Sequence, residues 1–151
     1  MELSQFLNQA RRQAYADEEQ NGAVLRDDGS KELCFSLDSF LYRDRWMGIN
    51  PFMGEELVWQ AGILVWGMNY FGKVLDETVP ASQVDRFLEQ VLRQALTDGP
   101  CRGPEYFRAG AFTYVDKCHG GLEDFTGEEL IYFRDQQVYT LVYHGGSLSA
   151  G

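Results

Sequence analysis

Apolar side chains recur at every third or fourth position in two segments of the chain, residues 2–16 and 83–97. This spacing aligns them along one side of a helix, so it predicts two amphipathic helices. Between and after the helices, shorter segments alternate apolar and polar residues, as half-buried strands do. The predicted strands span residues 33–36, 39–45, 55–60, 63–71, 105–108, 111–117, 128–133 and 136–143. The acidic segment 17–30 lacks any such period and is predicted to be an exposed loop.

The chain contains its own pattern twice. Residues 6–14 of the first predicted helix recur as residues 87–95 of the second, and residues 52–72 match residues 125–145 at 8 of 21 positions. Each half therefore runs in the same order, a helix followed by strands. This order predicts an α+β fold in which internally duplicated units of a helix and antiparallel strands are related by a pseudo-twofold axis, with two main helices on an antiparallel sheet.

One hairpin decides which side chains share a face of the predicted sheet. A two-residue turn at Ala61-Gly62 would pair Val58 with Val65 and Glu55 with Met68. This register places β-branched residues beneath the helices and aromatic residues on the opposite face. The aromatic face then consists of Leu57, Trp59, Leu64, Trp66, Met68 and Tyr70, matched by Leu130, Tyr132, Tyr139, Leu141 and Tyr143, with Glu55 and Glu128 at its edge. This apolar face must be covered, and three coverings are possible: the other half of the chain, a second copy of the chain, or a ligand.

Composition narrows the classes of partner. At 151 residues the chain fits a single domain of two repeats, about residues 1–75 and 82–151. A formal net charge of -10 disfavours direct contact with nucleic acid or an anionic membrane. The first residues lack the basic start and the apolar run that are typical of a signal peptide, and no apolar stretch approaches the roughly 18 residues of a membrane span. A cytoplasmic location is expected.

The three cysteines, Cys34, Cys101 and Cys118, show no spacing typical of a disulfide framework or a zinc site. We therefore expect unpaired thiols, no metal and no cofactor. No nucleophile elbow, phosphate-binding loop, dinucleotide fingerprint or helical zinc-protease motif is present in the sequence.

Glu55 and Glu128 occupy equivalent positions in the two repeats, and two facing carboxylates would supply an acid and a base. The alternative is that each glutamate only opens a strand and bonds a neighbour such as Arg43. Positions that differ between the repeats, Asn69 against Val142 and Phe71 against His144, are candidates for specialised chemistry. The candidate ligand-binding residues are Tyr42, Arg43, Glu55, Trp66, Met68, Asn69, Tyr70, Glu128, Tyr139 and Tyr143, and the candidate catalytic residues are Glu55, Glu128 and His144. The pseudo-twofold is predicted to bring Glu55 near Glu128 and Trp66 near Tyr139.

In one order, the chain carries the strings YRD (42–44), GEELVW (54–59), WGMNYFG (66–72), RGP (102–104) and YHGG (143–146). With these strings it resembles an uncharacterised prokaryotic domain family whose members occur alone or fused behind a helix-turn-helix domain. The resemblance implies a sensing or partner-binding module. The duplicated plan is also similar to gyrase-inhibitor-like effector-binding domains, which implies a ligand groove between the halves.

These observations lead us to expect a cytoplasmic module that binds a small ligand, for effector sensing or sequestration. The ligand would be planar and either cationic or rich in hydrogen-bond donors, stacked on Trp66 and Tyr70 and bonded by Glu55 or Glu128. One alternative is an enzyme in which these glutamates perform acid/base chemistry, with Tyr70, Tyr143 and His144 as proton donors. Another is a protein-interaction or homodimerisation module that covers the aromatic face.

Overall fold

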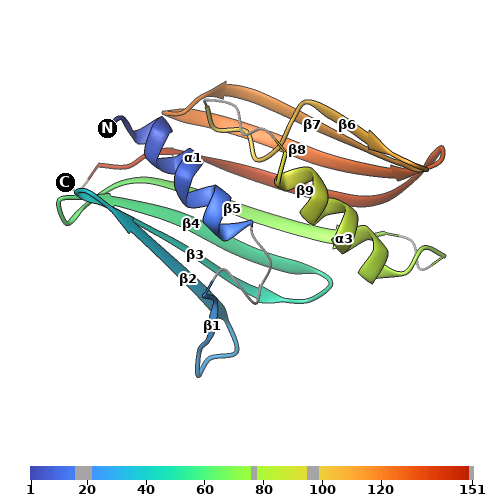
Figure 1. Ribbon diagram of the computed structural model, residues 1–151, viewed down its shortest axis with the longest axis horizontal. Coiled ribbons are helices and arrows are strands. Elements are labelled where there is room, and N and C mark those ends of the chain that lie inside the picture. The colour runs from blue at the N-terminus through green and yellow to red at the C-terminus, as the bar shows by residue number, and fades with distance from the viewer. Residues whose placement is uncertain (16–21, 76–77, 95–98, 150–151) are drawn as a thin grey trace.

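The computed structural model describes residues 1–15, 22–75, 78–94 and 99–149. Within these residues, two helices, α1 (Leu3–Ala14) and α3 (Ala81–Leu92), lie on one face of a nine-stranded antiparallel sheet (Figure 1). The strands are β1 (Val24–Leu25), β2 (Lys31–Leu37), β3 (Phe40–Gly48), β4 (Phe52–Gln60), β5 (Ile63–Val74), β6 (Tyr106–Ala109), β7 (Phe112–Gly121), β8 (Asp124–Phe133) and β9 (Gln136–Ser147). The predicted α+β class is therefore confirmed.

The strand order across the sheet is β1-β2-β3-β4-β5-β9-β8-β7-β6. The first half thus runs outward from β5 and the second half outward from β9, and these two strands pair at the centre with Tyr70 opposite Tyr143. Because these tyrosines are equivalent in the repeats, an order that mirrors itself about them fits the internal duplication.

The two helices pack on the sheet through equivalent aromatic contacts. Phe6 of α1 stacks on Phe40 with ring centroids 4.8 Å apart, and Phe87 of α3 stacks on Phe112 at 5.0 Å. All four rings belong to the hydrophobic core or pack directly against it. Burial of such rings supplies much of the stabilisation of a core and fixes each helix over its own group of strands.

The two helices begin in different ways. α1 begins with a capping box in which the side chains of Glu2 and Gln5 bond each other's backbone. α3 begins after Pro80, without a side-chain cap.

Each long hairpin contains a β-bulge that the sequence pattern did not reveal. The turn at Ala61-Gly62 forms as predicted, but Val58 pairs with Trp66 instead of Val65. The bulge in the other hairpin lies at the equivalent position, between Ile131 and Tyr132. Because side chains alternate between faces with a period of two, one extra residue moves every later side chain of the strand to the other face relative to its partner.

Two other expectations fail. Part of the predicted loop 17–30 forms strand β1, which pairs with β2, whereas residues 16–21 lie outside the described residues. Cys101 and Cys118 form a disulfide, with Cα atoms 5.8 Å apart, although unpaired thiols were expected. The topology brings Cys101, just before β6, onto β7, a proximity that sequence spacing alone does not express. Neither helix of the described residues is long and apolar enough to cross a membrane.

Candidate functional site

Glu56 and Glu129 face the helices, on the same side of their strands as Val58 and Ile131, and the bulges bring Trp66 and Tyr139 onto that face as well. Glu56 is 1% exposed, and its carboxylate receives hydrogen bonds from Arg11 Nε (3.0 Å), Arg11 Nη2 (3.2 Å) and the Tyr42 hydroxyl (2.7 Å). Nearby, the Tyr70 hydroxyl donates to Asp44 Oδ1 at 2.7 Å. Although burial alone would raise the pKa of Glu56, the Arg11 guanidinium lowers it below the usual value. Glu56 is therefore held as a buried carboxylate.

The second repeat contains an equivalent group around Glu129. Its carboxylate is bonded by Arg102 Nε at 3.0 Å and by the Tyr114 hydroxyl. The Tyr143 hydroxyl donates to Asp116 Oδ1 at 2.8 Å. Two tyrosines, a glutamate and an aspartate thus repeat with the same bonds, and a different arginine completes each set.

The arginines reach their glutamates from unrelated places. Arg11 belongs to α1, and the equivalent position in α3 is Leu92; Arg102 precedes β6, and the equivalent position before β2 is Ser30. Arg11 Nη1 also donates to the carbonyl oxygen of Cys101 at 3.2 Å, so a residue of the first half ties down the segment that carries Arg102. The symmetry of the fold is therefore broken at its centre.

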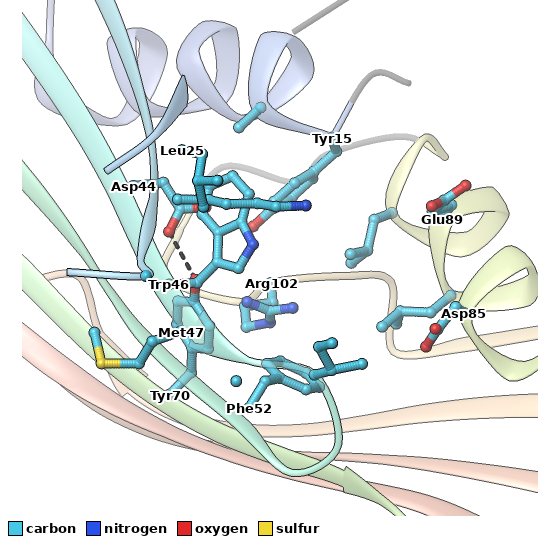
Figure 2. Close-up of a pocket in the computed structure, with 17 residues that line it drawn as sticks. Tyr15, Leu25, Asp44, Trp46, Met47, Phe52, Tyr70, Asp85, Glu89 and Arg102 are labelled. Carbon is cyan, nitrogen blue, oxygen red and sulfur yellow. Dashed lines mark hydrogen bonds between the residues drawn. The ribbon is translucent and has the colours of Figure 1, made fainter. Parts of the chain in front are cut away.

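A pocket of about 690 Å³ opens beside this centre, between the two helices and strands β3 to β5 (Figure 2). We call it the helix-side pocket. Asp44, Tyr70 and Arg102 line its floor, and Trp46 and Phe52 supply aromatic walls (Figure 2). The remaining lining residues are Ala14, Tyr15, Leu25, Gly29, Lys31, Met47, Gly48, Ile49, Asp85, Leu88, Glu89 and Leu92. Its size and its mixture of apolar walls with few polar groups are typical of small-molecule sites.

Asp44 is the unusual carboxyl group of this pocket. Among the described residues, its hydrogen bond comes from Tyr70, whereas the equivalent Asp116 also receives one from Gly103 N–H at 3.2 Å. Asp116 is 4% exposed, but Asp44 is only half-buried because it faces the pocket. Burial, followed by the charge of Glu56, raises the pKa of Asp44 to about 7. Asp44 can therefore exchange a proton near neutral pH.

Two further polar groups lie close to Asp44. The Tyr15 hydroxyl is buried and has no hydrogen-bond partner within the described residues, although buried polar groups are normally bonded. Burial and the charge of Glu56 raise the pKa of Tyr15, so its hydroxyl stays neutral. The guanidinium of Arg102 lies 5.0 Å from the centre of the Tyr70 ring. Tyr15 and Asp44 thus line the pocket with hydrogen-bonding capacity that the described residues do not use fully.

The predicted aromatic face is divided by the register shift. Several of its residues, among them Trp66, Met68, Tyr70, Tyr139 and Tyr143, belong to the buried core beneath the helices, as does the predicted ligand-binding residue Tyr42, whereas Trp59 lies on the open face. Trp66 is fully buried, and its Nε1 donates to the carbonyl oxygen of Leu122 at 3.0 Å. Among these predicted ligand-binding residues, Tyr70 lines the helix-side pocket.

The predicted glutamates lie on the opposite, open face of the sheet. In the sheet, Glu55 of β4 is opposite Asn69 of β5, which is opposite His144 of β9. Glu55 Oε1 also lies 3.5 Å from Arg43 Nη2. Strands β5 and β9 separate Glu55 from Glu128, and three strand spacings amount to about 14 Å. The two carboxylates therefore cannot share one small site, which corrects the expected convergence.

Trp66 and Tyr139 are also far apart. Trp66 pairs with Ser147 and Tyr139 with Val74, so eight residues of strand, or about 26 Å, separate them. The positions that differ between repeats do meet: Asn69 pairs with His144, and Phe71 pairs with Val142.

These four differing positions line a hollow of about 540 Å³ on the open face, together with Met47, Met53, Gly54, Glu55 and Tyr70. Phe71 and Val142 are each about half exposed. A homodimer or partner protein could use this surface, and that alternative stays a prediction. Within the described residues, no group of three His, Cys, Asp or Glu side chains is placed to hold a metal ion.

Sequence reasoning missed Asp44, Tyr15, Trp46, Phe52 and Arg102. A signal for Asp44 was present, because the spacing Tyr-x-Asp occurs in both repeats and marks the buried hydrogen bonds described above. Trp46 and Arg102 are not repeated, since Cys118 and Ser30 stand at the equivalent positions, and only the folded chain shows that both residues line one pocket.

Comparison with known proteins yields one match. The model of a family described as Domain of unknown function (DUF5680) covers residues 44–148, which is more than half of the chain and includes both bulged hairpins, Asp44 and Arg102. No curated protein and no solved structure matches the chain. The chain therefore belongs to the DUF5680 family.

Proposed function

We propose that this chain is a small-molecule-binding module whose site is the helix-side pocket. The observation that carries the proposal is a cavity of about 690 Å³ that combines aromatic walls with an unpartnered buried hydroxyl, that of Tyr15, and the half-buried carboxyl of Asp44. Leaving a buried hydroxyl unbonded costs about 1–3 kcal/mol, and a ligand that bonds it would recover this energy.

The ligand class expected from the sequence fits this pocket better than the open face. Trp46 and Phe52 can hold a planar body between them, in the role that was expected of Trp66. Asp44 takes the role that was expected of Glu55. An effector-sensing or sequestering function in the cytoplasm remains part of the proposal.

Two tryptophans provide a matched test. Trp46 lines the helix-side pocket, whereas Trp59 lies on the open face beneath Arg43, and both side chains are half-buried. A fragment library is screened against the wild-type chain by ligand-observed NMR. We expect hits that lose binding in Trp46→Ala and keep it in Trp59→Ala. A second variant, Leu88→Trp, narrows the pocket and should also weaken binding of the hits. The absence of hits, or hits that bind unchanged to both Trp46→Ala and Leu88→Trp, would contradict the proposal.

An enzyme is a second candidate, because Asp44 has a pKa of about 7 and contacts the Tyr70 hydroxyl. A general acid or base works best when its pKa lies near the working pH. In this alternative the general acid or base is Asp44, because the predicted catalytic residues Glu55, Glu128 and His144 lie on the open face of the sheet, away from the pocket. Incubating each confirmed ligand with the protein and analysing it by mass spectrometry tests this: an Asp44-dependent product supports an enzyme, and recovery of unchanged ligand excludes catalysis on that ligand.

A further inference from the structure

We infer that the helix-side pocket selects an organic cation, a planar group that carries N–H donors such as an amidinium or a protonated nitrogen heterocycle, with Asp44 as its counter-ion. This inference rests on the proposed function and names the chemical class of its ligand. It depends on three features of the pocket: which charges are already paired, where the aromatic rings lie, and which polar atoms remain available.

The basic residue on the pocket floor is already neutralised. Arg102 is 6% exposed and bonds Glu129 at 3.0 Å. Deeper in the structure, Arg11 is paired with Glu56 in the same way. By contrast, no ion pair among the described residues includes Asp44, and Asp85 of α3, an exposed residue, lines the same pocket. Lys31 of β2 also lines the pocket, but the charge beside Tyr70 on its floor that lacks an ion-pair partner in the described part of the chain is the negative charge of Asp44.

The aromatic residues favour the same class of ligand. Trp46, Phe52 and Tyr70 surround the floor, and the Phe52 and Tyr70 rings lie edge to face with centroids 6.3 Å apart (Figure 2). The faces of such rings attract cations, most strongly when water is excluded. A planar cation could stack on Trp46 while its N–H groups point toward Asp44.

The polar atoms that remain available accept hydrogen bonds. Asp44 uses Oδ1 for the Tyr70 hydroxyl and presents the rest of its carboxyl group to the pocket. The Tyr15 oxygen, which is buried and unpartnered within the described residues, supplies a second acceptor. An amidinium could share its N–H groups between these two acceptors, as such groups do in paired hydrogen bonds to carboxylates.

Binding of a cation should release a proton at neutral pH. The groups that surround Asp44 are Glu56 of β4, Tyr70 of β5, Arg11 and Tyr15 of α1, Arg102 before β6, Lys31 of β2, and Asp85 and Glu89 of α3. In the free protein, burial and Glu56 keep part of the Asp44 population protonated at pH 7. A bound cation favours the carboxylate, so the Asp44 proton passes to the buffer.

Calorimetric titration with three probes of one shape tests the inference: benzamidine, which is a cation, benzamide, which is neutral, and benzoate, which is an anion. We expect benzamidine to bind at least about tenfold more tightly than the other two at pH 8. Its affinity should fall about tenfold per pH unit below pH 6, and titrations at pH 7 in buffers of different ionisation enthalpy should show proton release. Asp44→Asn, which can still accept the Tyr70 hydrogen bond, should abolish the preference for benzamidine, and Glu55→Gln on the open face should retain it.

Tighter binding of benzoate, proton uptake, an unchanged preference in Asp44→Asn or no binding of benzamidine would each overturn the cation assignment. Loss of the preference in Glu55→Gln would move the cation to the open face and overturn it as well. The pH profile and the proton count use the wild-type chain, so they decide the question even if Asp44→Asn does not fold. If library fragments still require Trp46 while benzamidine fails, the pocket function stands and only the ligand class is wrong.

Discussion

Replacing Arg11 by Leu should strongly destabilise this protein, although the second repeat has Leu92 at the same position. Arg11 is 1% exposed and donates to both oxygens of Glu56, at 3.0 and 3.2 Å, and to the Pro100 and Cys101 carbonyls, at 3.3 and 3.2 Å. Without it, Glu56 keeps the Tyr42 hydrogen bond but becomes a buried charge without a counter-ion. Breaking such a pair costs about 3–5 kcal/mol of unfolding free energy.

The pH dependence of Arg11→Leu distinguishes charge from packing. In the wild type, Arg11 lowers the pKa of Glu56, so the pair stabilises the fold above the unfolded pKa of about 4.3 and this contribution is lost as the pH falls. The deficit of Arg11→Leu should therefore be largest at pH 7 and shrink toward pH 4. A deficit that comes only from lost packing would not change over this range.

Urea denaturation at pH 7, 5.5 and 4, followed by circular dichroism, measures these free energies without adding salt. The double variant Arg11→Leu/Glu56→Leu should be at least about 2 kcal/mol more stable than the sum of its single variants predicts, because it leaves no unpaired charge. A deficit of Arg11→Leu below about 1 kcal/mol at pH 7, or additive single variants, would refute the assignment of Arg11 as the counter-ion that the buried Glu56 requires.

Three further predictions follow from the same clusters. Asp44→Asn should be more favourable to folding at pH 8 than at pH 4, by at most about 4 kcal/mol of unfolding free energy. The reason is that the raised pKa of Asp44, about 7, makes the wild-type protein lose stability as the pH rises from about 4 to 7. Equal effects of the substitution on the unfolding free energy at both pH values would contradict this. Reduction of the Cys101–Cys118 disulfide should cost about 3 kcal/mol through the entropy of the closed loop, and an unchanged melting temperature in dithiothreitol would show that the bond does not matter. Gly127→Ala should lose about 1–3 kcal/mol in urea denaturation because its Cβ would overlap the Tyr143 ring, whereas Gly121→Ala, whose nearest new contact is 3.6 Å away, should be nearly neutral.

The sequence predicted the fold because the signals for it are local and repeated. Helix periodicity, the Ala61-Gly62 turn and the matching order of the two halves all lie within short segments, and the structure contains each of them. The α+β class followed from these alone. The pairing of β5 with β9 was not predicted, because two strands far apart in the chain show no local sign of adjacency.

The site was predicted less well because of one residue in each hairpin. Val65 and Val138 are the extra residues of the two bulges, and neither differs in type from an ordinary strand residue. Without them, alternation puts Glu55 on the face of Trp66; with them, Glu56 takes that place. The one-residue shift therefore led the sequence prediction to place Glu55 and Glu128, instead of Glu56 and Glu129, on the face of the aromatic residues. The glutamate pair of each repeat was still correctly noticed.

The duplicated fold and the pocket are best understood together. Positions identical in the two repeats, such as Tyr70 and Tyr143, make the hydrogen bonds that hold each half. The arginines are the exception, and their difference in origin has a spatial consequence. Arg102 approaches from the second half, where Ser30 stands at the equivalent place in the first, and its guanidinium lies over the Tyr70 ring; within the described residues, Asp44, beside that ring, lacks the backbone donor that Asp116 receives from Gly103. The centre at which the symmetry of the repeats is broken thus also holds the one carboxyl group of the two Tyr-x-Asp sets that faces the helix-side pocket.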